Sequence, residues 1–371
     1  MALPADVFSR ESDEQLRVLD ADGTVVAPEL VPNLDDEAFV SMYRDMRFCR
    51  RFDERMISLQ RQGRIGTYAS LAGQEGSQIG SMYALSDEDV VSYQYREHGA
   101  VVERGFPWEY LLYWAGHEDG HRALADRNIF PLNISIGDHL PHVTGVAMAM
   151  KFREESRVAV AHFGDGATSE GDFHEALNFA GVFDVPALFV CNNNQWAIST
   201  PQGEQTASRT FAQKADAYGF EGVQVDGMDP LAMYVVTQAA REKALDASNE
   251  APRPTFIEAV QYRYGAHTTA DDPSVYRDDE EVEQWRQKDP LDRFEAFLRE
   301  TGRLDDEQIE AIDEESTDVL ADAVDRMESF EADPNSMFEY TYAEQTSEIH
   351  EQHEQFQRHR ETYGDESFLR E

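Results

Sequence analysis

The sequence predicts an α/β fold in which a parallel β-sheet is covered by helices on both faces. Five apolar runs are spaced along the chain, VVSYQ, VAVAHF, ALFVCN, VQVDG and TFIEAVQY, and segments with helical spacing lie between them. Strands that alternate with helices favour parallel pairing with both faces of the sheet buried. Ligands of such sheets bind at the carboxyl ends of the strands. We therefore expect the functional site where these runs end.

The chain is expected to have three parts. Residues 1–34 contain scattered acids, an Asp-Gly turn and prolines, and we expect an N-terminal extension that wraps the surface or a partner. Residues 35–279 form the α/β domain, which opens with a helix pair that reaches about Arg64. Residues 280–371 are expected to be an acidic helical appendage. Its final polar segment, residues 340–371, is expected to be a helix that packs on another subunit.

The chain is strongly acidic. Of its 371 residues, 73 are acidic and 32 are basic, which gives a formal net charge of −41. This charge disfavours nucleic acid and anionic membranes as partners, because both would repel it. An apolar fraction of 41% nevertheless indicates a folded chain. Acid spread along the whole length is typical of a protein from a high-salt cytoplasm, where salt screens the repulsion. An acidic tail for a basic partner is the alternative.

Cysteine usage and the terminus indicate a cytoplasmic protein. Two cysteines, Cys49 and Cys191, do not make a disulfide framework. No apolar run reaches the length that spans a bilayer. The first residues lack the basic start and the apolar core of a signal peptide. We expect no contact with a membrane.

Two polar motifs follow neighbouring predicted strands. GDG at residues 164–166 comes directly after VAVAHF, and an asparagine run ending at Asn194 follows ALFVC. In a strand–loop–helix–strand unit the two strand ends lie side by side, so Asp165 and Asn194 can converge. Carboxylate and amide oxygens suit Mg²⁺ and leave positions open for phosphate. Glycines let the backbone approach an anion, and the following helix start offers free N–H groups. The motifs therefore predict a Mg²⁺–diphosphate site.

The same stretch resembles the thiamine-diphosphate signature, in which GDG is followed at a distance by NN. Further matching segments are GRIGTYASLAGQEGSQIGSMYAL, YREHGAVVERGFP, AISTP, VDGMDPLAMY and YRYGAHTTADDPSVYR. Together they resemble the α subunit of the heterotetrameric first component of 2-oxoacid dehydrogenase complexes, of the pyruvate and branched-chain type. The resemblance extends over residues 35 to 300, so it is not a single short motif.

The resemblance implies a thiamine-diphosphate-binding fold and an enzyme that uses thiamine diphosphate and Mg²⁺. It implies an α2β2 heterotetramer in which the β subunit supplies the glutamate that activates the cofactor. This sequence offers no candidate for that glutamate. A small 2-oxoacid would be decarboxylated, and the acyl group would pass to the lipoyl group of a dihydrolipoamide acyltransferase. The motifs look closest to bacterial pyruvate dehydrogenase. Branched-chain 2-oxoacid or acetoin enzymes, a stand-alone decarboxylase and a non-catalytic paralogue are the alternatives.

The resemblance also implies roles for individual residues. Asp165, Asn194 and the main-chain carbonyl of Trp196 match the metal ligands. His267 matches the catalytic histidine, which donates to phosphate and to the carbonyl oxygen of the 2-oxoacid and helps to pass on the acyl group. The expected cofactor-binding residues are Tyr95, Arg96, Ile134, Ile136, Gly164, Asp165, Gly166, Ala167, Asn194, Trp196 and His267.

Three of these residue types suit their expected neighbours. Arg96 would reach the diphosphate with its planar donors, and Tyr95 would pack near the aminopyrimidine. Ile136 would be wedged under the cofactor and hold it bent. A surface ion pair is the alternative for Arg96, and core packing is the alternative for Ile136. Asn192 has either a role in the site or only a place in a turn.

Other polar residues near these motifs are candidates for smaller roles. Arg64 and Tyr68 are candidates for contact with the carboxylate of the 2-oxoacid. Thr268 and Thr269 follow His267 where animal relatives carry a regulatory phosphoserine, and we do not expect them to be phosphorylated. His139 and His142 have the spacing of a metal pair, but the sequence offers no third ligand.

Overall fold

The computed structural model of this chain describes residues 7–8, 15–246, 251–339 and 341–368. The chain divides into two compact units, Met1–Met327 and Glu328–Glu371. The three-part division expected from the sequence stays a prediction.

The first unit is built on a five-stranded sheet with the order β1-β2-β3-β7-β6, in which every neighbouring pair is parallel. Each strand overlaps one of the five apolar runs, so the predicted α/β fold with a parallel sheet is confirmed. The strands are β1 (Val90–Ser92), β2 (Ala159–Gly164), β3 (Ala187–Asn193), β6 (Glu221–Asp226) and β7 (Thr255–Val260). A separate antiparallel pair joins β4 (Trp196–Ala197) to β5 (Thr200–Pro201).

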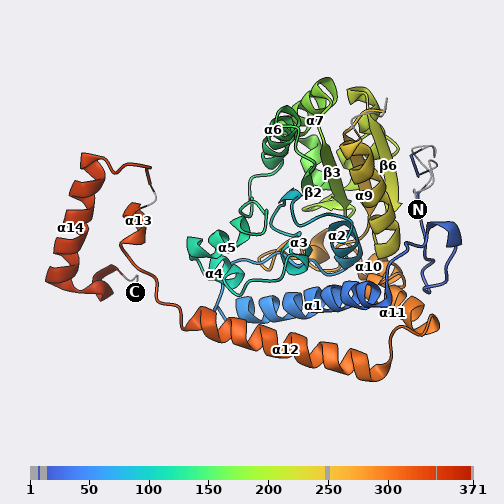
Figure 1. Cartoon of the computed structure of the whole chain (residues 1–371). Coiled ribbons are helices and arrows are strands. Elements are labelled where there is room, and N and C mark those ends of the chain that lie inside the picture. Colours follow the sequence, from blue (N-terminus) through green and yellow to red (C-terminus); the bar gives the residue numbers. More distant parts are fainter. Residues whose placement is uncertain (1–6, 9–14, 247–250, 340, 369–371) are drawn as a thin grey trace. The chain divides into compact units, whose positions relative to one another are not determined.

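Helices cover both faces of this sheet, as Figure 1 shows. On one face, α6 (His139–Phe152), α7 (Gly171–Phe183) and the 3₁₀ helix η5 (Ala212–Tyr218) share a hydrophobic core with alternate residues of β2 and β3. On the other, α9 (Pro230–Leu245) packs against β3, β6 and β7, and α2 (Glu75–Met82) packs on α9. Both faces of the strands are therefore buried, which explains why their sequences are almost continuously apolar.

The prediction of a helix pair between residues 35 and 64 is wrong. The structure has one helix there, α1 (Asp36–Arg61). Asp35 caps its first turn by accepting a hydrogen bond from the backbone N–H of Ala38 at 2.8 Å. No glycine or proline interrupts the segment, and its buried residues recur every three or four positions, so one apolar stripe runs along the whole helix.

Short helices connect these main elements. Of these, the 3₁₀ helix η4 (Asp165–Ser169) packs on β2 and β3, and α8 (Gln202–Gln205) packs on η4, β4 and β5. The others are η2 (Pro28–Leu30), α3 (Gly99–Glu103), α4 (Tyr110–Trp114), η3 (Glu118–His121), α5 (Arg122–Ala125) and η6 (Pro273–Val275).

The N-terminal segment from residue 15 onward packs on the sheet of its own chain. Leu16 forms a parallel bridge with Val225 of β6. The backbone N–H groups of Val18 and Leu19 both donate to Asp229 Oδ2 at 2.7 Å. This part of the expected extension therefore wraps the surface of the chain itself.

Three acidic helices follow the sheet in the first unit: α10 (Asp279–Arg286), α11 (Pro290–Glu300) and α12 (Asp306–Glu328), the last of which ends at the unit boundary. The second unit contains α13 (Ser336–Glu339), α14 (Ser347–Tyr363) and η7 (Asp365–Phe368). Within it, Phe338 stacks on His353 with ring centroids 4.8 Å apart. The helix expected in residues 340–371 is thus present as α14, while residues 340 and 369–371 lie outside the described part.

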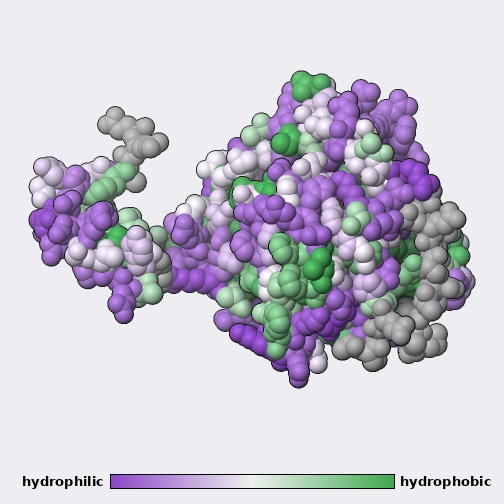
Figure 2. All heavy atoms as spheres, turned by 90° about the horizontal axis from the view of Figure 1, so that it is seen from above, coloured by the Kyte–Doolittle hydropathy of each residue, from purple (hydrophilic) through white to green (hydrophobic). Residues whose placement is uncertain are grey.

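Hydrophilic residues dominate the face of the molecule shown in Figure 2, and hydrophobic residues form separate patches on it. Both cysteines are buried and free. In the described part of the chain, no helix combines the length and the apolar character needed to cross a membrane.

Candidate functional site

The site lies at the carboxyl edge of the sheet. Gly164, the last residue of β2, is in register with Asn192 in β3. Asp165 opens η4 directly after β2, and Asn194 follows β3. The predicted convergence of these two residues therefore occurs, and both line one cavity of about 610 Å³.

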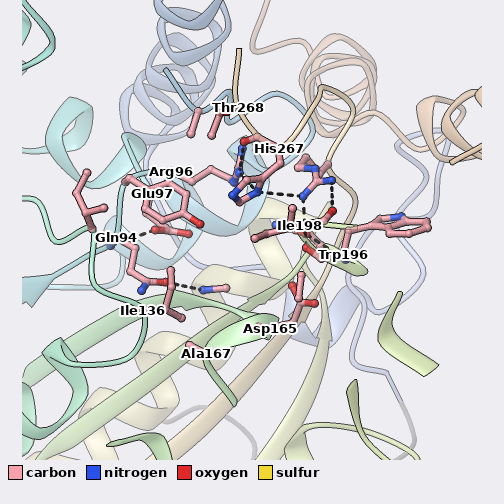
Figure 3. Close-up of a pocket in the computed structure, with 18 of the residues that line it drawn as sticks. Gln94, Arg96, Glu97, Ile136, Asp165, Ala167, Trp196, Ile198, His267 and Thr268 are labelled. Carbon is pink, nitrogen blue, oxygen red and sulfur yellow. Dashed lines mark hydrogen bonds between the residues drawn. The ribbon is translucent and has the colours of Figure 1, made fainter. Parts of the chain in front are cut away.

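All of the expected cofactor-binding residues line this cavity. They are Tyr95, Arg96, Ile134, Ile136, Gly164, Asp165, Gly166, Ala167, Asn194, Trp196 and His267. Figure 3 shows Arg96 and His267 joined by hydrogen bonds on one side of the cavity and Asp165 on the other. The segments come from the loop after β1, from residues 134–136, from η4 and from the turns after β3 and β7.

Three oxygen donors form the candidate metal site. The carboxylate of Asp165 is 1% exposed, and burial raises its pKa, while a hydrogen bond from Gln205 acts in the opposite direction. Asn194 Oδ1 accepts a hydrogen bond from the backbone N–H of Trp196 at 3.3 Å. The carbonyl oxygen of Trp196 accepts one from Arg263 Nη1 at 3.4 Å. One carboxylate, one amide and one carbonyl make a donor set that fits Mg²⁺ and leaves room for phosphate oxygens.

Two buried arginines face the cavity without an acidic partner. Arg96 is 4% exposed and Arg263 is fully buried. Arg96 donates to the carbonyl oxygens of Ser70 at 2.5 Å and His267 at 2.6 Å. In the described part of the chain neither arginine makes an ion pair, so the surface ion pair considered for Arg96 is wrong. Buried charges are costly unless an opposite charge compensates them, and this pair therefore suits a bound anion.

Arg263 is held in place by neutral acceptors. Its Nη2 donates to the carbonyl oxygen of Ile198 at 2.8 Å and to the Tyr276 hydroxyl at 3.0 Å. Its buried Nε has no partner among the described residues. Burial and the charge of Arg96 lower the pKa of Arg263 to about 10, so it stays cationic at neutral pH. The charge is fixed in position, but its hydrogen-bonding capacity is not exhausted.

His267 lies between these two guanidinium groups. Its Nδ1 is 3.2 Å from Arg96 Nη2 and 3.4 Å from Arg263 Nη1. Burial and the two positive charges lower the pKa of His267 to about 4. The imidazole is therefore neutral at pH 7, and because both neighbours are donors, Nδ1 accepts and the proton lies on Nε2. The ring of Tyr95 packs edge-on to it, with centroids 5.9 Å apart.

The mouth of the cavity is apolar. Ile134 is 59% exposed, Ile136 is 37% exposed and Ile198 is 56% exposed, although all three line the cavity. Ile136 therefore does not pack in the core of the described chain, which was the alternative for this residue. Ile198 has a φ of 57°, a backbone conformation that a β-branched residue rarely adopts. The turn between β4 and β5 thus presents an isoleucine to the cavity.

Gln94, Glu97 and Arg263 are among the cavity residues that sequence reasoning missed. The carboxyl group of Glu97 is buried, and burial raises its pKa to about 7. Glu97 Oε2 accepts a hydrogen bond from the backbone N–H of Gln94 at 3.2 Å. Arg263 directly follows a predicted strand, and Glu97 comes shortly after another. Their position at a strand end is the one sequence signal that could have identified them.

Several other sequence candidates lie outside the cavity. Tyr68 is fully buried and donates to Asp53 Oδ1 at 2.9 Å, so it does not reach the cavity. Arg64 is also absent from the cavity lining. Asn192 is a buried strand residue whose Oδ1 accepts from Ser77 Oγ at 2.9 Å and Gln261 Nε2 at 3.0 Å, so it is not in a turn.

The remaining candidates have contacts that the structure defines. His139 is buried with its Nε2 3.0 Å from the carbonyl oxygen of His162, whereas His142 is exposed. Thr268 lines the cavity. Thr269 Oγ1 accepts a hydrogen bond from the backbone N–H of Tyr68 at 3.1 Å.

Comparison with known proteins agrees with this geometry. The family model described as the dehydrogenase E1 component matches residues 43–335. The pyruvate dehydrogenase E1 component subunit alpha of Staphylococcus aureus (strain Mu50) is 42% identical over 344 residues, which cover 92% of each chain. The subunit of the same name from Staphylococcus epidermidis is 41% identical over 344 residues, which again cover 92% of each chain. The chain therefore belongs to the dehydrogenase E1 component family.

Proposed function

We propose that this chain is the α subunit of a pyruvate dehydrogenase E1 component and that its cavity binds the diphosphate of thiamine diphosphate together with Mg²⁺. The observation that carries the proposal is the pair of buried arginines, Arg96 and Arg263, that face the cavity with no acidic partner in the described chain. The close relatives from staphylococci bear the name of this subunit, which supports the assignment of the reaction.

The donor groups suggest how the cofactor is held. Asp165, Asn194 and the carbonyl of Trp196 would bind Mg²⁺, and the diphosphate would complete its coordination. Arg96 and Arg263 would neutralise the diphosphate. Added to Gly166, a Cβ atom would lie 3.0 Å from Ala197 Cβ, so this glycine allows η4 and β4 to pack closely around the metal site. Thiamine diphosphate, when bound, supplies the nucleophilic carbon and the electron sink for decarboxylation of a 2-oxoacid.

His267 and the apolar rim would serve the reaction itself. Neutral His267 carries its proton on Nε2, so it can donate a hydrogen bond to a phosphate or to the carbonyl oxygen of the substrate. Ile136 would press against the cofactor from the rim, and Tyr95 would pack near the aminopyrimidine. The site is open at this rim, because Ile134, Ile136 and Ile198 line the cavity and remain exposed.

The exposed apolar rim supports the proposal of a partner subunit. We propose that a β subunit covers the apolar rim in an α2β2 heterotetramer and supplies the glutamate that activates the cofactor. Glu97 is unsuited to that role, because the charge of Arg96, which we place at the diphosphate end, acts on it. The acyl acceptor would be the lipoyl group of a dihydrolipoamide acyltransferase. Branched-chain 2-oxoacids and acetoin remain the alternative substrates.

We also propose a cytoplasm of high salt concentration as the environment of the chain. A net charge of −41 on 371 residues gives strong self-repulsion. Molar salt shortens the range of that repulsion to about 3 Å. The acidic residues occur in both units, on helices such as α10, α12 and α14, so an acidic tail alone does not account for the charge.

Co-expression with a candidate β subunit in high salt tests the proposed function. Ferricyanide-linked decarboxylation would be measured with pyruvate, 2-oxobutyrate, three branched-chain 2-oxoacids and acetoin, each with and without thiamine diphosphate and Mg²⁺. We expect turnover of pyruvate that requires both cofactors. Lack of turnover on every substrate, from an assembled and cofactor-loaded tetramer, would favour the non-catalytic paralogue.

A further inference from the structure

We infer that Gln205 is a positioning residue for Asp165: its amide holds one carboxylate oxygen and so directs the other to the cation. The inference rests on the proposed function, because it needs Asp165 to be a metal ligand. Gln205 ends α8 and comes from a segment about forty residues beyond Asp165 in sequence, so the contact arises only in the folded chain.

The contact is short and well defined. Gln205 Nε2 donates to Asp165 Oδ2 at 2.6 Å. The same nitrogen donates to the carbonyl oxygen of Thr200 at 3.2 Å. Both protons of the amide therefore have an acceptor, one in the carboxylate and one in β5. The side chain therefore joins the β4–β5 pair, which carries Trp196, to η4, which begins at Asp165.

The orientation of this amide is set by its partners. Both neighbouring groups are acceptors, so the nitrogen and not the oxygen must face them. The opposite end of the amide, Gln205 Oε1, is buried and has no hydrogen-bond partner among the described residues. An unpaired buried oxygen costs free energy. In this position the amide N–H groups of Gln205 have hydrogen-bond partners and its oxygen has none. This is what we expect if the hydrogen bond to Asp165 determines where the side chain lies.

The coordination geometry of Mg²⁺ explains how the hydrogen bond from Gln205 to Asp165 would affect the metal. Mg²⁺ requires near-ideal octahedral geometry, so a carboxylate ligand binds it best through one oxygen. A neutral amide on Oδ2 blocks two-oxygen binding and still leaves the full negative charge of Asp165 for the cation. An arginine or lysine in the same place would neutralise that charge. Partners that orient a metal ligand in this way typically change metal affinity by about 10- to 100-fold when they are removed.

A purely structural role for Gln205 would be to anchor α8 to the rest of the chain. The two roles differ in what they affect. An anchor stabilises the chain whether or not metal is present, whereas a positioning residue changes the affinity for the cation. The test therefore needs a metal-binding measurement beside a stability measurement.

The variant Gln205→Met keeps the length and approximate volume of the side chain and removes both donors. Exposed Glu204, the preceding residue of α8, gives the matched control Glu204→Met. Each variant would be assembled with the β subunit and stripped of cofactor. Mn²⁺ would then be titrated in the presence of saturating thiamine diphosphate, and the free ion followed by electron paramagnetic resonance. Thermal unfolding of the metal-free complexes would be measured in parallel, with Gln205→Ala as a second variant.

We expect Gln205→Met and Gln205→Ala to raise the dissociation constant of Mn²⁺ by about 10- to 100-fold, while Glu204→Met leaves it unchanged. The metal-free complexes should unfold at similar temperatures. Equal Mn²⁺ affinity in the wild type and in both Gln205 variants would overturn the inference and leave the proposed function intact. A wild-type complex that binds no Mn²⁺ in a manner dependent on thiamine diphosphate would instead overturn the proposed function.

Discussion

The charges that face the cavity come from a few side chains whose properties depend on one another. Burial and the charges of Arg96 and Arg263 lower the pKa of His267 and keep it neutral, and burial brings the pKa of Glu97 to about 7. An arriving diphosphate therefore meets two fixed cations, one neutral imidazole and one carboxyl group whose pKa is raised to about 7. Perturbed groups of this kind are typical of functional sites. Two predictions follow from their protonation.

Binding of thiamine diphosphate should depend on the protonation of Glu97. The folded-state pKa of Glu97 is raised, so the group becomes ionised as the pH rises through about 7, and an ionised carboxylate repels the diphosphate. Calorimetric titration of the assembled complex at about pH 6 and about pH 8 should show tighter binding at the lower pH, by up to about tenfold. In Glu97→Gln this difference should shrink.

The matched control is Glu170→Gln, since Glu170 also lines the cavity but is exposed. It should retain the wild-type pH dependence, which includes the titration of the phosphate itself. The same pH dependence in the wild type and in Glu97→Gln would show that Glu97 does not sense the ligand.

His267→Ala should impair acyl transfer more than it impairs assembly. The variant removes the Nε2 proton donor, and such groups contribute typically about 10²- to 10⁴-fold to rate. Reductive acylation of a lipoyl domain by the complex with the β subunit would be measured. His350→Ala, an exposed histidine of the second unit, is the control and should be unaffected. Wild-type acyl transfer by His267→Ala would contradict the role given to this histidine.

At the scale of elements, the site depends on how closely η4 packs against the β4–β5 turn. Gly166 and Gly164 flank Asp165, but only Gly166 is in a crowded place: an added Cβ would lie 3.0 Å from Ala197 Cβ, whereas at Gly164 it would meet nothing within 4 Å. From the sequence, both glycines were expected to let the backbone approach an anion closely. The structure shows a second reason why position 166 needs a glycine: two backbone segments approach each other closely there.

Gly166→Ala should therefore destabilise the chain and Gly164→Ala should not. Crowding of this kind costs typically about 1–3 kcal/mol, which should lower the unfolding temperature of the cofactor-free complex. Gly164 has a φ of −79°, which alanine adopts without strain, so it serves as the control. Equal unfolding temperatures for the two variants would show that η4 and β4 separate easily.

Much of the fold and part of the site could be predicted from the sequence. The five strands were found because both faces of the sheet are buried, which leaves continuous apolar runs. Asp165 and Asn194 were found because each follows a strand end directly. Glu97 and Arg263 were missed because their relevance depends on burial and on contacts between loops distant in sequence. The break expected in α1 was wrong because a single apolar stripe continues through it.

At the scale of the whole molecule, the dominant property is its charge of −41. If the chain works in high salt, the assembled complex should gain stability when KCl rises from about 0.2 M to about 2 M, because screening shortens the repulsion. We expect the unfolding temperature to rise by more than about 2 °C, which for a chain of this size corresponds to at least ~1 kcal/mol. Sucrose at matched osmolality is the control for excluded-volume effects. A complex that is equally stable at both salt concentrations would contradict the halophilic assignment.

The measurement that tests the central claim most directly compares thiamine diphosphate with thiamine. The two ligands differ only in the diphosphate, so the ratio of their dissociation constants reports on the groups that bind the diphosphate, and a change of this ratio in an arginine variant reports on that arginine. Hydrogen bonds to charged groups contribute about 1.5–3 kcal/mol. We predict that Arg263→Gln lowers the preference of the assembled complex for thiamine diphosphate over thiamine by about 10- to 100-fold. The control Arg286→Gln, on α10 outside the cavity, should keep it. An unchanged preference in Arg263→Gln would contradict the account of this cavity as a diphosphate site.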